Sequence, residues 1–225
     1  MFIWLASYPK SGNTLLRSML ASYFFSKDGN YFFGLIKNIK QFPHGGLFMK
    51  HGVDISNHNE TIKNYIKVQE TFNKKNSVQF LKTHSYLFNF NQQFSFTDFN
   101  NSLGVIYIVR DPRNIVNSLS KFKNTTIEQT ADFMIKSSGD GFTWTNTWSN
   151  NFHSWKTFKE HGKYMLIKYD DLITNRELIF LNVLKFIYRL NNSKFTIDKN
   201  KFDNVIKTTT SENMQKLEKQ TGFGE

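Results

Sequence analysis

The sequence predicts an α/β domain with three layers, αβα, in which helices cover both faces of a mostly parallel central sheet. Four short apolar runs have the length of buried strands, at residues 2–7, 78–83, 104–109 and 164–169. Stretches whose apolar residues recur at helical spacing lie between them. Strands that alternate with helices in this way build a parallel sheet, because each crossover helix returns the chain to the same end of the sheet.

The first and third runs carry the strongest local signals. The run at 104–109, GVIYIV, is rich in β-branched residues, as buried parallel strands are. After the first run, Pro9 prevents further strand pairing and Gly12 permits a tight turn. A helix is then predicted from apolar residues at helical spacing, which are Leu15, Leu16, Met19, Leu20 and Tyr23.

The remaining elements follow from the same kinds of signal. The glycine-rich segment 28–56 is predicted to be irregular, with a short helix near 34–39. Ser56 or Asn57 is predicted to cap a helix over 60–72. Apolar stripes predict further helices at 112–122, 127–135, 144–158 and 172–188.

The composition is typical of one domain over residues 1–225 with a substantial core. Hydrophobic residues make up 39% of the chain and 24 residues are Phe, so we expect an aromatic-rich core. The chain has no cysteine, which excludes disulfides and thiolate metal sites and fits a reducing cytoplasm. No apolar run approaches the ~20 residues that a membrane span needs, and the first residues lack a signal-peptide pattern. We therefore expect a cytoplasmic protein that does not bind a membrane.

The charge balance favours an anionic partner. The chain has 29 Lys and Arg residues against 18 Asp and Glu residues, which gives a net charge of +11. Nucleic acid, a membrane surface and a polyanionic small molecule would each use this surplus. The basic residues are scattered without a run of five, which argues against a nucleic-acid-binding tail. A cofactor with several negative charges uses the surplus equally well.

The loop after the first predicted strand has the features of an anion site. It presents Lys10, Ser11 and several backbone N–H groups, and the helix that follows adds its positive N-terminus. The full P-loop pattern is absent, because the lysine precedes the glycine. An ordinary loop with a solvated lysine is the alternative interpretation of this stretch alone.

Three other predicted strands end in residues that carry chemistry. Lys82 lies at the end of the second strand and His84 follows it, Arg110 and Arg113 follow the third, and Tyr169 ends the fourth. Ligands of parallel sheets bind beyond the carboxyl ends of the strands, so these groups and Lys10 are expected on one rim. A histidine at a strand end is more often a structural hydrogen-bond donor than a catalyst, and a serine within a helix, such as Ser118, is often merely solvated.

Two stretches resemble the cofactor-binding motifs of the cytosolic-type sulfotransferases, which use 3′-phosphoadenosine 5′-phosphosulfate (PAPS). YPKSGNT at 8–14 resembles their 5′-phosphosulfate loop, and IVRDPRNIVNSLSKF at 108–122 resembles their 3′-phosphate motif. The resemblance implies a P-loop NTPase-like fold, PAPS as the sulfuryl donor and no metal. It implies that Arg110 and Ser118 hold the 3′-phosphate. The implied 5′-phosphate-binding residues are Lys10, Ser11, Gly12, Asn13 and Thr14.

Further segments resemble the catalytic and adenine-binding stretches of the same family. Lys82-Thr83-His84 looks like the segment whose histidine is the catalytic base, so the implied catalytic residues are Lys10, Lys82 and His84. YDDL at 169–172 and TTTSENMQKL at 208–217 resemble the segments that imply contacts of Tyr169 and Thr209 with adenine. The implied reaction moves a sulfuryl group from PAPS to an acceptor hydroxyl or amine.

The sequence also departs from the family pattern. Relatives place adenine-stacking aromatic residues where Leu15 and Ser211 stand here. They also continue into an Arg-Lys-Gly segment that holds the 3′-phosphate, whereas the printed sequence reaches residues 222–225 at about that point. The resemblance therefore predicts a single sulfotransferase domain over residues 1–225 that lacks this segment.

Two other functions remain open from the sequence. A nucleotide or small-molecule kinase shares the phosphate loop, but it would need a Walker lysine and a magnesium-binding acid, and we identify neither. A non-catalytic basic module that binds a nucleotide or nucleic acid is the third. For the sulfotransferase we expect a small-molecule or glycan acceptor, no nucleic acid, no membrane, and a monomer or homodimer. Aromatic residues in 23–48 and 144–155 fit an apolar acceptor pocket and an ordinary core equally well.

Overall fold

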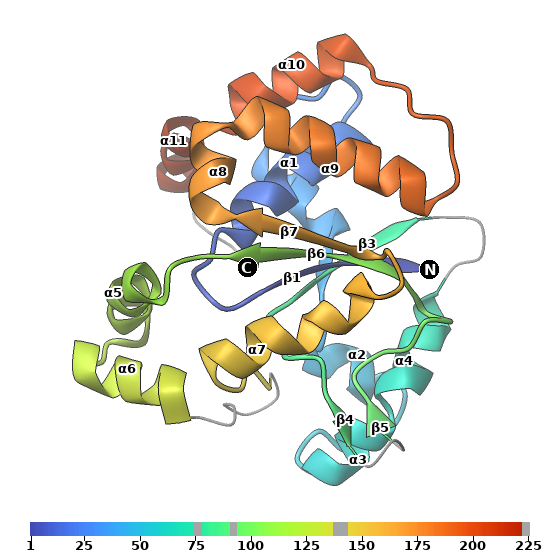
Figure 1. The fold of residues 1–225 in the computed structure, drawn as a ribbon, viewed down its shortest axis with the longest axis vertical. Helices are drawn as coiled ribbons and strands as arrows, with labels where there is room; N and C mark the ends of the chain where they lie inside the picture. Colours follow the sequence, from blue (N-terminus) through green and yellow to red (C-terminus); the bar gives the residue numbers. More distant parts are fainter. Residues whose placement is uncertain (74–77, 91–93, 137–143, 222–225) are drawn as a thin grey trace.

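The central feature of the computed structural model is a five-stranded sheet in which every neighbouring pair of strands is parallel (Figure 1). The structure describes residues 1–73, 78–90, 94–136 and 144–221. The strand order is β2-β3-β1-β6-β7, and the expected mostly parallel sheet is confirmed. The strands are β1 (Phe2–Ser7), β2 (Lys40–Gln41), β3 (Gln79–Thr83), β6 (Ser102–Val109) and β7 (Tyr164–Lys168). A separate antiparallel pair consists of β4 (Asn89–Phe90) and β5 (Phe94–Ser95).

Helices cover both faces of the sheet, which gives the three layers that the sequence predicts (Figure 1). Alternate residues of β1 divide between the layers: Ile3 and Leu5 pack into one core, and Trp4 and Ala6 into the other. The first layer contains α1 (Asn13–Phe25), α8 (Tyr169–Thr174), α9 (Arg176–Leu190) and α10 (Lys199–Thr208), with the 3₁₀ helix η1 (Phe33–Asn38). The second contains α2 (Gly45–Met49), α3 (His58–Lys63), α4 (Tyr65–Phe72), α7 (Trp148–Ser154) and the 3₁₀ helix η2 (Trp155–Lys159).

The core of the second layer is built from aromatic rings. Trp4 lies at its centre, with its ring centroid 5.1 Å from that of Phe96, 5.8 Å from Phe42 and 6.1 Å from Trp155. All four side chains are buried. Tilted and edge-on aromatic pairs at these distances are favourable beyond the area they bury, by about 0.5–1.5 kcal/mol each. The expected aromatic-rich core is therefore present on this face of the sheet, and the core on the other face also contains buried aromatic residues, among them Tyr23, Phe180 and Phe202.

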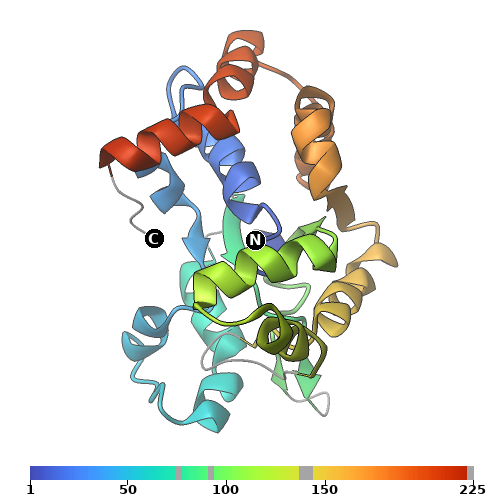
Figure 2. The same ribbon diagram turned by 90° about the vertical axis from the view of Figure 1, so that its left-hand side faces the viewer.

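Two helices lie beyond the carboxyl ends of the strands (Figure 2). They are α5 (Pro112–Lys123) and α6 (Ile127–Lys136), and they pack on each other and on the loop after β1 through a small core of Tyr8, Ile115, Leu119 and Met134. α5 begins as expected, because Asp111 accepts a hydrogen bond from the backbone N–H of Arg113 and Pro112 occupies the first turn. This packing holds α5 across the strand ends.

Three long helices expected from the sequence are interrupted in the structure. Residues 60–72 form two helices, α3 and α4, which meet at Asn64, and Asn57 caps the first of them as expected. Residues 172–188 contain a break at Asn175, between α8 and α9. The helix expected at 144–158 begins only at Trp148 and tightens into η2 after Ser154. At Asn64 and Asn175 the asparagine side chain can compete with the helix for backbone hydrogen bonds. The spacing of apolar residues does not reveal such a break.

Other boundaries differ less. Tyr169, expected as the end of the fourth strand, is the first residue of α8. The short helix expected near 34–39 is present as η1. The sequence did not predict α10 or the final helix α11 (Ser211–Thr221). Across the described residues, no helix combines the length and apolarity needed to cross a membrane. The expectation about residues 222–225 falls outside the described part of the chain.

Candidate active site

A cavity of about 590 Å³ opens at the carboxyl edge of the sheet. Residues in or directly after all five parallel strands line it, because parallel strands bring their carboxyl ends to one edge. Helices α5 and α6 form its outer wall. The lining residues are Pro9, Lys10, Gly12, Asn13, Thr14, Gln41, Lys82, His84, Arg110, Ser118, Leu119, Phe122, Lys123, Phe133, Thr145 and Tyr169.

The loop between β1 and α1 forms one end of the cavity. Lys10 and Gly12 both have positive φ, of 64° and 92°, and α1 begins after Gly12 without a side-chain cap. A Cβ atom on Gly12 would overlap the ring of Tyr169, so only glycine allows this close approach. The first backbone N–H groups of a helix have no acceptor within it. The uncapped start of α1, lined by Gly12, Asn13 and Thr14, is therefore suited to bind an anion.

The side chain of Asn13 anchors this loop to the first strand. Its Nδ2 donates hydrogen bonds to the backbone oxygen of Leu5 at 2.9 Å and to Oγ of Ser7 at 3.2 Å. Because Nδ2 is used inside the protein, the donor that Asn13 can offer to an anion is its backbone N–H, and its buried Oδ1 has no hydrogen-bond partner. Ser11 is buried next to it, and its hydroxyl has no hydrogen-bond partner.

His84, directly after β3, is held by the end of β1. Its Nδ1 lies 2.8 Å from the backbone oxygen of Ser7. A carbonyl oxygen can only accept, so the proton of the neutral imidazole is on Nδ1 and Nε2 is the unprotonated nitrogen. Burial, together with the positive charge of nearby Lys82, lowers the pKa of His84 to about 3. The side chain is therefore a neutral imidazole at physiological pH, as a general base must be.

Lys82 is buried, and its ammonium donates a hydrogen bond to Oε1 of Gln41 at 3.1 Å. Gln41 ends β2, the edge strand next to β3. Sequence reasoning missed Gln41, because a strand of two polar residues leaves no periodic signal. The contact directs the lysine along the edge of the sheet and into the cavity that both residues line.

Arg110, directly after β6, contacts both the loop after β1 and the start of α8. Its Nη1 donates to the backbone oxygen of Lys10 at 3.0 Å, and its guanidinium lies 4.2 Å from the ring centroid of Tyr169. Its Nε is buried without a hydrogen-bond partner. Buried donors of this kind are rarely left unpaired, so the group is suited to an acceptor on a bound ligand. Ser118, one of the residues of α5, lines the same cavity.

Two of the residues predicted to bind the cofactor do not line this cavity, namely Ser11 and Thr209. Thr209 is fully buried at the end of α10, and its hydroxyl donates to the backbone oxygen of Val205 at 2.7 Å. The backbone oxygen of Thr209 accepts a hydrogen bond from Arg176. The structure thus gives the side chain of Thr209 a role in ending a helix.

The outer wall contains an aromatic pair that sequence reasoning did not assign to the site. Phe122, on α5, lies under the ammonium of Lys10, with 4.7 Å between the nitrogen and the ring centroid. Phe133, on α6, lies 3.9 Å from the ammonium of Lys123 by the same measure. Cations over aromatic faces are attracted by the ring quadrupole. These contacts place two positive charges beside an apolar wall.

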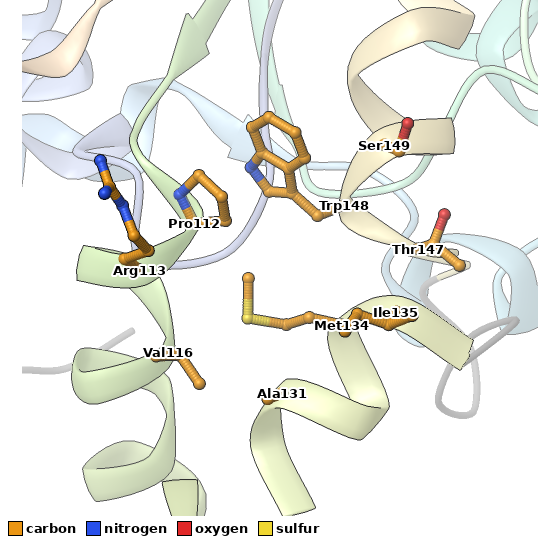
Figure 3. A pocket seen from close by; sticks show the side chains of 9 residues that line it. All are labelled: Pro112, Arg113, Val116, Ala131, Met134, Ile135, Thr147, Trp148 and Ser149. Atoms are coloured by element: carbon orange, nitrogen blue, oxygen red, sulfur yellow. The ribbon is translucent and has the colours of Figure 1, made fainter. Parts of the chain in front are cut away.

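A second cavity, of about 380 Å³, lies between α5, α6 and α7 (Figure 3). Its wall is mainly apolar and includes Val116, Met134, Ile135 and Trp148. None of the predicted catalytic or cofactor-binding residues lines it, whereas Arg113, which was expected on the same rim as Arg110, does. Most of the predicted groups therefore line the first cavity and not the more apolar one.

The charges of the first cavity define a class of protein. Lys10, Lys82, Arg110 and Lys123 line it, and its lining residues include no Asp or Glu. Among the described residues, no group of three or more His, Cys, Asp or Glu side chains is placed to hold a metal ion. A cationic cavity at the carboxyl edge of a parallel sheet, beside an uncapped helix start, defines an α/β protein with a site for a phosphorylated ligand.

The family follows from the sequence as a whole. Residues 2–222 match the sulfotransferase domain family, and the chain belongs to that family. A comparison with curated proteins finds no match.

Solved structures share the fold at low sequence identity. Mouse sulfotransferase SULT7A1, solved in complex with PAP, is 18% identical with a TM-score of 0.59, over 95% of this chain and 65% of the mouse chain. Retinol dehydratase, solved in a complex with retinol and PAP, is 12% identical with a TM-score of 0.63, over 99% of this chain and 70% of that protein. This chain thus spans slightly less than two thirds of the length of the mouse enzyme.

Proposed function

We propose that the protein is a sulfotransferase that moves a sulfuryl group from PAPS to an acceptor hydroxyl or amine. The observation that carries the proposal is the convergence of Lys10, Lys82, His84, Arg110 and Ser118 in one cavity without carboxylates. They come from the ends of β1, β3 and β6 and from α5. Membership of the sulfotransferase domain family and the PAP bound in solved relatives add support.

The residues present fit a nucleotide with phosphates at both its 3′ and 5′ positions. The ammonium of Lys10 and the uncapped start of α1 suit the 5′ end. Arg110 and Ser118 suit the 3′-phosphate, and the buried Nε of Arg110 still lacks an acceptor. The adenine is expected beside Tyr169, which lines the cavity, whereas Leu15 and Ser211 offer no aromatic face. Thr209 is not expected to hold adenine through its hydroxyl, which is already used within α10.

Each of three side chains has a distinct task in the proposed reaction. The acceptor oxygen or nitrogen bonds to sulfur while the bond from sulfur to the bridging oxygen of the 5′-phosphate breaks. His84 takes the acceptor proton on Nε2, the nitrogen that its contact with Ser7 leaves unprotonated. Lys10 stabilises the negative charge that develops on the bridging oxygen as PAP leaves. Lys82, held by Gln41, neutralises charge on the sulfuryl oxygens.

The remaining expectations about partners stay part of this proposal. We infer a small-molecule or glycan acceptor, a monomer or homodimer, and activity without nucleic acid or a membrane. Retinol in the complex of retinol dehydratase is one example of a small molecule bound by a protein of this fold. The absence of cysteine supports a reducing, cytoplasmic compartment.

Ligand binding separates this function from its alternatives. We expect PAP to raise the melting temperature of the protein, and ATP with Mg²⁺ or a single-stranded oligonucleotide to have a much smaller effect. Stabilisation by ATP with Mg²⁺ alone would favour the kinase, and stabilisation by the oligonucleotide alone would favour a nucleic-acid-binding module.

Arg110→Ala should weaken PAP binding in calorimetry. Lys10→Ala and His84→Ala should each lower turnover at least ~100-fold. Near-normal rates in either variant would exclude its catalytic role.

A further inference from the structure

A second basic cavity, of about 770 Å³, adjoins the candidate active site. Gln41 lines both cavities, so the two share the wall that also positions Lys82. The segment from η1 through β2 to α2 supplies most of the lining, and this segment lies in the region 28–56. Its lining residues are Arg17, Ile36, Lys37, Lys40, Gln41, His44, Gly46, Leu47 and Lys50.

The order of the strands places this cavity on the acceptor side. The groups expected to hold the nucleotide, Arg110 and Tyr169, follow β6 and β7. The groups expected at the sulfuryl end, Lys82 and His84, belong to β3 and its end. Along the edge of the sheet the next strand is β2, which ends in Gln41. An acceptor that approaches the sulfuryl end from the side away from the nucleotide therefore passes the basic cavity.

The lining of this cavity is positively charged, and three of its cations have no ionic partner among the described residues. Lys37, Lys40 and Lys50 are exposed, and they form no ion pair with any described residue. Arg17 adds a fourth cation, and its guanidinium is fixed by hydrogen bonds to the backbone oxygens of Ile36 and Ile39. No Asp or Glu is among the lining residues, and Ile36 and Leu47 are the only large apolar ones.

The charge of the donor explains why such a lining is needed. A donor with two phosphates and a sulfate repels any acceptor that is also anionic, and cations between the two relieve that repulsion. A neutral apolar acceptor would instead favour a mainly hydrophobic wall. We propose that the acceptor is a hydroxyl-bearing polyanion, namely a saccharide with several carboxylate or sulfate groups, and that Lys37, Lys40 and Lys50 recognise it. This inference rests on the proposed sulfotransferase function.

Calorimetry with matched trisaccharides tests the proposal on the PAP-saturated protein. The probes are trigalacturonate, a sulfated maltotriose and unmodified maltotriose, which separate carboxylate from sulfate recognition and both from a neutral sugar. We expect at least one anionic trisaccharide to bind at least ~10-fold more tightly than maltotriose, with an affinity that falls as KCl is added. Equal affinity of all three would overturn the proposal.

Matched variants assign the effect to this cavity. The triple variant Lys37→Gln, Lys40→Gln, Lys50→Gln should weaken binding of the anionic trisaccharide at least ~10-fold and change the PAP affinity little. Its control, Lys159→Gln, Lys185→Gln, Lys194→Gln, removes the same charge from exposed positions outside both cavities and should bind like the native protein. An unaffected first variant would also overturn the proposal. Failure of PAP itself to bind would instead refute the sulfotransferase function.

Discussion

His84 shows how its surroundings prepare one side chain for a chemical role. The contact with the backbone oxygen of Ser7 fixes which nitrogen carries the proton, and burial with Lys82 nearby keeps the ring neutral. A bound anion beside Lys10 and Lys82 would offset their charge and raise the pKa of the imidazole toward its ordinary range. The free protein therefore holds the base in its neutral form, and the ligand makes it more basic.

The lowered pKa of His84 predicts sensitivity to acid. An unfolded histidine titrates near 6.5, whereas the folded one titrates at about 3. Between these values the unfolded chain binds a proton that the folded chain does not, so folding stability falls as the pH drops through this window. Replacing His84 with Asn should reduce the loss of unfolding free energy between pH 7 and pH 5 by about 1–2 kcal/mol. Urea unfolding of both proteins at the two pH values measures the difference, and parallel losses would contradict the prediction.

The sequence revealed most residues of the candidate site because they belong to short, dense motifs at strand ends. His84 and Arg110 follow an apolar run directly and Lys10 follows one closely, so the strand signal and the chemical signal reinforce each other. Gln41 gave no such signal, because its role in the site depends on a hydrogen bond with Lys82, a residue 41 positions away. The sequence also did not predict that Phe122 and Phe133 line the cavity, because their positions depend on how α5 and α6 pack.

At the scale of elements, the junction of β1 and α1 carries the tightest constraint. The chain reverses there with positive φ at Lys10 and Gly12, and Tyr169 at the start of α8 packs against the glycine. The sequence predicted the strand, turn and helix of this junction, since Pro9 and Gly12 are local signals. It did not predict the contact with α8, which depends on the position of β7 two strands away.

Substitution of Gly12 tests this junction. Gly12→Ala should destabilise the protein by roughly 1–3 kcal/mol and strongly reduce PAP binding, because the new methyl group must displace the ring of Tyr169. Gly52→Ala is the matched control, since Gly52 also has positive φ but open space around its Cβ position. Gly52→Ala should lose only the stability that backbone strain costs, and it should bind PAP normally in calorimetry. Normal PAP binding by Gly12→Ala would show that the loop adjusts.

Element boundaries were the least predictable part of the fold. The interruptions at Asn64 and Asn175 fall inside continuous apolar stripes, so helical periodicity alone extends across them. The strands β1, β3, β6 and β7 were predicted closely, because buried parallel strands are short apolar runs with clear ends. The two-residue strands β2, β4 and β5 were not predicted.

At the scale of the whole molecule, the net charge of +11 acts in two opposite ways. It attracts an anionic ligand to the carboxyl edge, where the two basic cavities lie. The surplus positive side chains also repel one another in the compact state, which lowers the folding stability of the protein without a ligand. Added salt should therefore stabilise the free protein and weaken its attraction for an anionic ligand.

Thermal unfolding at different salt concentrations tests this balance. As KCl is raised from 50 to 500 mM, the melting temperature of the free protein should rise, because the salt screens self-repulsion. The further increase caused by a fixed concentration of PAP should shrink over the same range, because the salt also screens attraction of the ligand. An increment that does not change with salt would mean that charge contributes little to PAP binding.

The guanidinium of Arg110 has a consequence for the kinetics of ligand capture. It contacts the backbone of Lys10 and the ring of Tyr169 at once, so the loops after β1 and β6 and the start of α8 are held together in the free protein. Preorganisation of this kind means that little conformational entropy is lost when a nucleotide docks. Association should then be limited by diffusion and orientation rather than by a slow rearrangement, with a single kinetic phase in rapid mixing.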